Sequence, residues 1–242
     1  MAVHTNLSNR LHAQLGEMIA KSSPGERLLT EPKLAEMLGV SRATLREAMR
    51  TFETQGLIQR RQGVGTFVVH PSGVIDTGLE WLESIESMAE RVGLTVRMGS
   101  YEITRREPLA DERQSLNAAE LLEVSRVIEA EDRPIAYLVD TLPSGLISEA
   151  ELQQDFTGSV LDLLLKKGNL AVNSSDTEIQ AAAVDPNVAR ALRIQRGDVV
   201  LHFRSSLVAL DGGVIALSKS YFLPGFFRFH VVRKVESRGL HS

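Results

Sequence analysis

The chain has 242 residues, of which 43% are hydrophobic and 24% charged, a composition typical of a globular protein large enough for two domains. It has no cysteine, which excludes disulfides and thiolate chemistry. Its start lacks a secretory apolar segment and no apolar run could cross a membrane, so we expect a cytoplasmic protein. The net charge is −4, but residues 1–70 carry +3 and residues 71–242 carry −7, which indicates two parts with different partners.

Three helices are predicted at the start of the chain. The first follows Ser8 as a possible N-cap, the second runs from Thr30 to Gly39, and the third begins after Ser41. Apolar residues recur at three- and four-residue steps on their buried faces: Leu11, Leu15 and Ile19; Leu34, Ala35 and Leu38; and Leu45, Ala48, Met49 and Phe52.

The spacing between the second and third helices predicts a helix-turn-helix. Ala35 is small enough for close approach of two helix backbones, Gly39 follows four residues later at the turn, and Leu45 is apolar six residues after the glycine. On the opposite face of the third helix lie Arg42, Thr44, Arg46 and Arg50. A recognition helix presents such residues to bases and phosphates, although the same pattern fits a solvated basic face of a three-helix bundle.

Two short apolar strands flank the glycine pair at 63 and 65, which predicts a β-hairpin wing carrying Arg60 and Arg61. The patterns "E..LAE.LGVSR.T.REA" and "G.GTFV" resemble the winged helix-turn-helix of the GntR family over about residues 8–69. With the helix and hairpin above, the resemblance implies a DNA-binding set of Glu31, Ser41, Arg42, Thr44, Arg46, Arg50, Arg61, Gln62, Gly63, Gly65 and Thr66. Pro32 and Val64 depart from the family pattern, in which basic residues are common at both positions.

The remaining chain predicts a second domain of the α+β class, built on an antiparallel sheet. Residues 70–78 are turn-rich and suggest a linker, and 79–93 suggests a helix in which Trp81 packs at the domain junction. Strands are expected at 94–106, 122–130, 134–142, 170–182, 198–210, 214–223 and 226–234, and helices at 111–119, 146–153, 159–167 and 186–193.

This second part resembles the UTRA effector domain of the HutC-type subfamily, which shares its fold with chorismate lyase. The expected domains are therefore a DNA-binding domain at 1–69, a linker at 70–78 and an effector-binding and dimerisation domain at 79–242. The resemblance implies a small-molecule pocket, for which we select Arg126, Ile128, Tyr137, Leu138, Ser159, Ala216, Ser218 and Phe222.

Four pocket positions that are polar in relatives sensing sugar phosphates are apolar here: Ile128, Leu138, Ala216 and Phe222. We therefore expect an effector less polar than a sugar phosphate, with one anionic or hydroxyl group at Arg126. Simpler roles stay open, since Arg126 could pair with a surface acid and Ser159 could only cap a helix.

The function expected is a homodimeric transcription regulator, a repressor, that binds a palindromic operator and responds to a small-molecule effector. An interaction-only second domain and an enzyme related to chorismate lyase are the alternatives. No nucleophile with a base, phosphate loop or metal-ligand spacing occurs, so we expect no enzyme, cofactor, metal site or membrane partner.

Overall fold

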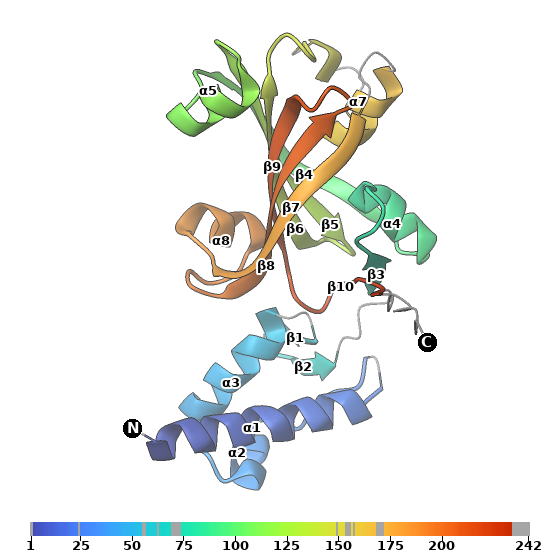
Figure 1. The fold of residues 1–242 in the computed structure, drawn as a ribbon. Helices are drawn as coiled ribbons and strands as arrows, with labels where there is room; N and C mark the ends of the chain where they lie inside the picture. Colours follow the sequence, from blue (N-terminus) through green and yellow to red (C-terminus); the bar gives the residue numbers. More distant parts are fainter. Residues whose placement is uncertain are drawn as a thin grey trace, which may run out of the picture.

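The computed structural model describes residues 2–23, 25–54, 57–61, 63–68, 74–148, 150–152, 156, 158–167 and 172–233. Figure 1 shows a smaller N-terminal body of helices and a hairpin, and a larger body built around a sheet. None of the helices in these ranges is both long and apolar enough to span a bilayer.

The N-terminal body has three helices followed by a hairpin: α1 (Ala2–Lys21), α2 (Glu31–Leu38), α3 (Arg42–Thr54), β1 (Ile58–Arg61) and β2 (Gly65–Val68). The two strands pair antiparallel, as expected of a wing. The N-cap assigned to Ser8 is wrong, because α1 already begins at Ala2 and Ser8 lies inside the helix.

The turn between α2 and α3 forms as its residues predict. Gly39 has φ of +64°, in the left-handed region, and its N–H donates to the carbonyls of Ala35 and Glu36. The backbone N–H of Thr44 donates to Ser41 Oγ at 3.1 Å, so Ser41 caps α3, whereas Thr30 precedes α2 without a side-chain capping bond. The predicted apolar faces meet in one buried core: Leu11, Leu15, Ile19, Leu34, Ala35, Leu45, Ala48, Met49 and Phe52.

The second body confirms the α+β class with a six-stranded antiparallel sheet in the order β4-β5-β6-β9-β8-β7. Its strands are β4 (Val96–Arg106), β5 (Leu121–Ala130), β6 (Arg133–Pro143), β7 (Val172–Ala183), β8 (Val199–Ala209) and β9 (Val214–Phe222). All six strands lie at or close to ranges that the sequence predicted as strands.

Helices cover both faces of this sheet (Figure 1). On one face lie α4 (Ile85–Arg91) and α7 (Val160–Lys167), and on the other lie α5 (Ala110–Leu116) and α8 (Pro186–Leu192). Beside α4 a small parallel sheet joins β3 (Ile75–Gly78) to β10 (Phe227–His230). Asp185 caps α8 with its carboxylate, which accepts from the N–H groups of Asn187 and Val188.

The expectations for residues 70–93 need correction. Residues 75–78 of the expected linker form β3, and the helix expected at 79–93 covers only Ile85–Arg91. Trp81 is 79% exposed, so the packing role assigned to it is wrong. The spacing of apolar residues suggested a longer helix. Pairing of β3 with β10, about 150 residues later in the chain, instead keeps residues 75–78 extended.

Candidate functional site

The exposed face of α3 presents the polar residues that the sequence placed there. Arg42, Thr44 and Arg46 are exposed, while Leu45 and Met49 on the opposite face are fully buried. The helix is therefore held to its neighbours by one face and leaves a cationic face open. Within the described residues Arg42 makes no ion pair, so its guanidinium is available to an acceptor on a partner.

A second arginine on this face is held in position by an acid. Arg46 Nε donates to Glu31 Oε2 at 2.6 Å, and Glu31 is the first residue of α2. Arg60 of the hairpin lies 3.9 Å from the other Glu31 oxygen. Glu31 thus links the helix-turn-helix to the wing and orients Arg46 at the open face.

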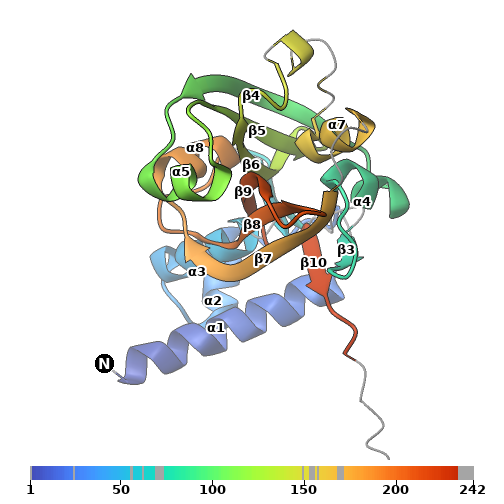
Figure 2. The same ribbon diagram turned by 45° about the horizontal axis from the view of Figure 1, so that its top comes forward.

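Arg50, expected to contact DNA, instead meets the second body. Its guanidinium donates to Gln195 Oε1 and to Asp198 Oδ1, each at 2.7 Å, and also to Glu47 of its own helix. Figures 1 and 2 show the end of α3 beneath the part of the second body that contains α8 and β8. Arg50 therefore connects the two bodies in this conformation.

Both glycines of the wing have positive φ angles. Gly63 has φ of +74° and Gly65 of +141°, and a Cβ on Gly65 would lie 2.6 Å from the side chain of Arg27. Arg61 lies over the Phe67 ring, whereas Thr66 is buried and contributes no exposed hydroxyl. The predicted contact residue Gln62 lies outside the described residues.

In the second body a row of polar side chains crosses one face of the sheet. Arg126 on β5 donates through Nη1 to Asp140 on β6, and the Ser218 hydroxyl on β9 donates to the other Asp140 oxygen. Ser205 on β8 is the cross-strand neighbour of Ser218 and hydrogen-bonds to Thr177 on β7 at 2.9 Å. Arg126 and Asp140 are buried, and Ser218, Ser205 and Thr177 are partly exposed, so the row runs from the interior of the domain toward its surface.

This polar row divides the apolar core of the face in two. Ile128, Leu138 and Phe222 belong to the cluster that also packs α4, and Leu122 and Ala216 belong to the cluster that packs α7. Burying a charged pair between apolar clusters is expensive and rarely stabilises a fold more than apolar residues would. The row is therefore a candidate for function rather than for stability.

The structure brings together most of the predicted pocket residues. Arg126, Ile128, Leu138, Ala216, Ser218 and Phe222 lie on the face just described. Ser159 lies at the start of α7, where its Oγ accepts from the N–H of Asp162 at 3.0 Å. Tyr137 alternates to the opposite face, where it stacks on Tyr221.

Three side chains at this row were missed by sequence reasoning: Asp140, Glu86 and Phe156. Asp140 lies two residues after Leu138 and so shares its face, which strand alternation could have shown. Phe156 lies under the Arg126 guanidinium, 5.6 Å from the ring centre. Glu86 comes from α4, and burial raises the pKa of its carboxyl, with Arg126, Asp140 and Asp162 as the nearby charges.

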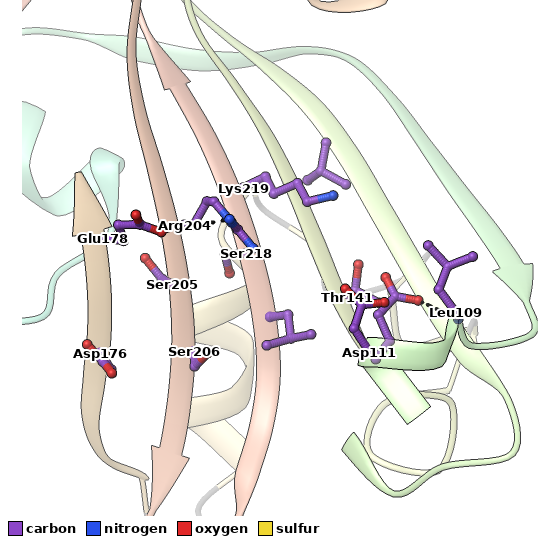
Figure 3. A pocket seen from close by; sticks show the side chains of 13 residues that line it. Leu109, Asp111, Thr141, Asp176, Glu178, Arg204, Ser205, Ser206, Ser218 and Lys219 are labelled. Atoms are coloured by element: carbon purple, nitrogen blue, oxygen red, sulfur yellow. Dashed lines mark hydrogen bonds and ion pairs between the residues drawn. The ribbon is translucent and has the colours of Figure 1, made fainter. Parts of the chain in front are cut away.

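Two hollows open on the other face of the sheet. The one in Figure 3 has a volume of about 270 Å³ and lies between α5 and the strands. Its charged groups have both signs: Asp111, Glu112, Asp176, Glu178, Arg204 and Lys219. The second lies beside α8 and includes Tyr137 and Glu129. Ser205 and Ser218 of the polar row also line the first hollow, whereas neither hollow includes Arg126 or Asp140.

Comparisons with known proteins match both bodies. The model of the bacterial regulatory proteins of the gntR family matches residues 7–68, and that of the UTRA domain matches residues 91–228. The transcriptional repressor NagR of Bacillus subtilis is 27% identical over 202 residues, covering 82% of each chain. The histidine utilization repressor of Pseudomonas putida is 28% identical over 206 residues, covering 80% of each.

The architecture is also found in solved structures. PhnF from Mycobacterium smegmatis superposes with a TM-score of 0.61 at 20% identity, covering 93% of this chain and all of that one. At this identity the similarity shows a shared fold.

Proposed function

Because the chain belongs to the gntR family of bacterial regulatory proteins and carries a UTRA domain, we propose that it is a homodimeric repressor that binds a palindromic operator and is controlled by a small molecule. Its relatives are transcriptional regulators, not enzymes. Residues 1–69 would bind DNA in the cytoplasm and residues 79–242 would bind the effector.

The observation that carries this proposal is the open cationic face of α3. Arg42 and Arg46 lie one helical turn apart near the start of the helix, where a recognition helix meets base edges in the major groove. Arginine can donate two hydrogen bonds to one guanine there, and Ser41 and Thr44 can meet phosphates beside it. A dimer would place two such helices one DNA turn apart, or a multiple of it.

Contact between the bodies supports control by an effector. Arg50 on α3 is bound by Gln195 and Asp198, which lie between α8 and β8. A ligand that favours another arrangement of the second body would change this contact, and its differential affinity for the two arrangements limits the size of the response.

The apolar positions Ile128, Leu138, Ala216 and Phe222 are all buried in core clusters and offer no hydrogen bonds. They support an effector less polar than a sugar phosphate. Screening metabolites for thermal stabilisation and for release of operator DNA tests this part. A second domain that only binds a protein partner would give no response to any compound.

The DNA proposal is tested by Arg42→Ala and Arg46→Ala, measured by fluorescence anisotropy with operator and random duplexes. Each substitution should lower operator affinity by about 1–3 kcal/mol and reduce discrimination between the duplexes. Arg113→Ala, an exposed arginine on α5 of the second body, is the matched control and should leave both values unchanged. Unaltered discrimination in both α3 variants would refute the assignment of α3 as the recognition helix.

A further inference from the structure

The second domain holds a half-buried carboxylate, one oxygen of which is fully buried and is not satisfied by the pair of Arg126 and Asp140. Glu86 is the second residue of α4, and its Oε1 is buried with no hydrogen-bond partner within the described residues. Burial raises the pKa of the Glu86 carboxyl, an effect opposed by a hydrogen bond from its own backbone N–H and by Arg126. Desolvation of the ionised carboxylate is therefore offset only in part, because Oε1 has no hydrogen-bond partner within the described residues.

The backbone before α7 makes room for this carboxylate. Gly158 has φ of +121°, a region that side chains other than glycine rarely adopt. A Cβ at this position would lie 2.7 Å from Glu86 Oε1. Among the described residues, a glycine in a special conformation thus lies beside a carboxylate oxygen, Glu86 Oε1, that has no hydrogen-bond partner, which is typical of a functional site rather than of packing.

Charge at this site is unbalanced toward negative. Arg126 is the cation among the charges that act on Glu86, and Asp140 and Asp162 act on it as anions. Asp140 already takes the guanidinium of Arg126 as its partner. An incoming phosphate or carboxylate would have to compete with Asp140 for Arg126 and would be repelled by Glu86.

Arg126 nevertheless keeps one donor unused. Its Nε–H is buried without a hydrogen-bond partner in the part of the chain that the structure describes, although its Nη1 donates to Asp140. The Phe156 ring lies against the guanidinium, and Tyr101 meets Phe156 edge-on with ring centres 6.1 Å apart. The site therefore offers one unused acceptor, one unused donor and aromatic surface.

We infer that the effector is an organic amine, whose ammonium group binds Glu86 and whose neutral carbonyl or hydroxyl oxygen accepts from Arg126 Nε. The inference rests on the proposed function in taking the UTRA domain as the effector-binding domain. An ammonium group satisfies the lone carboxylate oxygen and balances the charge, and a neutral oxygen satisfies the arginine without displacing Asp140. Aromatic surface from Phe156 and Tyr101 suits the carbon skeleton of such a ligand.

The test uses three small probes at tens of millimolar and constant ionic strength, since fragments of this size bind weakly. Glycinamide carries an ammonium group and a neutral carbonyl oxygen, glycolate carries a hydroxyl in place of the ammonium and a carboxylate in place of the amide, and inorganic phosphate is the anion alone. Thermal unfolding and the NMR signal of Arg126 Nε–H are followed in the full chain. Glycinamide should raise Tm and move the Arg126 signal, and the two anions should do neither.

The variant Glu86→Gln separates this site from unspecific stabilisation. Without any probe it should raise Tm by roughly a few degrees, because the uncompensated charge is gone, and it should abolish the response to glycinamide. Glu90→Gln, an exposed acid on the same helix, should change neither.

Three outcomes would overturn the inference: a response to glycolate or phosphate but not to glycinamide, an equal glycinamide response in Glu86→Gln, or no response to any probe. The operator measurements with Arg42→Ala and Arg46→Ala need no ligand, so failure of the proposed DNA function is recognised independently.

Discussion

The two bodies of this protein use arginine in opposite ways. On α3 the arginines Arg42 and Arg46 are exposed on a face whose other side is a continuous apolar core. In the second body Arg126 is buried in the middle of a face and separates two apolar clusters. An exposed cation can contact a large polyanion directly at the surface. A buried cation can pair only with a side chain or ligand that fits inside the domain. This contrast agrees with the proposal that the second domain binds a small molecule.

The largest expected effect comes from breaking the buried pair. Arg126→Met leaves Asp140 buried without its cation and should lower the free energy of unfolding by about 3–5 kcal/mol. Arg46→Met removes an exposed partner of Glu31 and should lower it by no more than about 1 kcal/mol. Urea denaturation followed by circular dichroism measures both.

The double variant Arg126→Met with Asp140→Leu removes both charges at once. It should recover most of the lost stability, since apolar residues of similar size often replace a buried pair without loss. If Arg126→Met proved no more destabilising than Arg46→Met, the contrast between buried and exposed arginines would not hold.

A smaller effect is expected at the turn of the N-terminal body. Gly39→Ala places a side chain at φ of +64° with no atom within 4 Å of its Cβ, so only backbone strain contributes. The free energy of unfolding should fall by about 1–2 kcal/mol. Gly39→Asn should be affected less, because asparagine adopts the left-handed region more readily. Equal stability of the alanine variant and the parent, by the same denaturation measurement, would contradict this account of the turn.

The smallest effect is expected at the contact between the bodies. Asp198→Asn removes the ion pair between Asp198 and Arg50. Because Arg50 then becomes available to a phosphate, operator affinity should rise a few-fold, which corresponds to less than about 1 kcal/mol. Arg50→Ala should lower affinity instead. Anisotropy titrations at low salt distinguish the two signs, and weaker binding by Asp198→Asn would show that the contact assists DNA binding.

The sequence predicts the N-terminal body well because its determinants are local. Gly39, Ser41 and the apolar steps on α3 lie within fifteen residues, and each acts through a backbone or face preference that single residues carry. The six strands of the large sheet were likewise predicted from local strand signals.

Contacts between distant segments were not predictable in this way. The extended segment that contains β3 depends on β10, and no local pattern reveals that partner. Asp140 and Glu86 come from a strand and a helix separated by more than fifty residues, and only the folded sheet brings them to Arg126. Most of the residues predicted for the pocket therefore share one face of the sheet, but the prediction missed the acids that change the charge of that face.

The exposure of Trp81 gives this protein a built-in optical label. It is the only tryptophan in the chain, and it lies in water just after β3, beside the small sheet that joins distant parts of the second body. The emission maximum of its indole should therefore lie at long wavelength, and iodide should quench the fluorescence readily. Any assembly or ligand-driven rearrangement that covers this segment would shift the emission to the blue, so binding could be followed in the unlabelled protein.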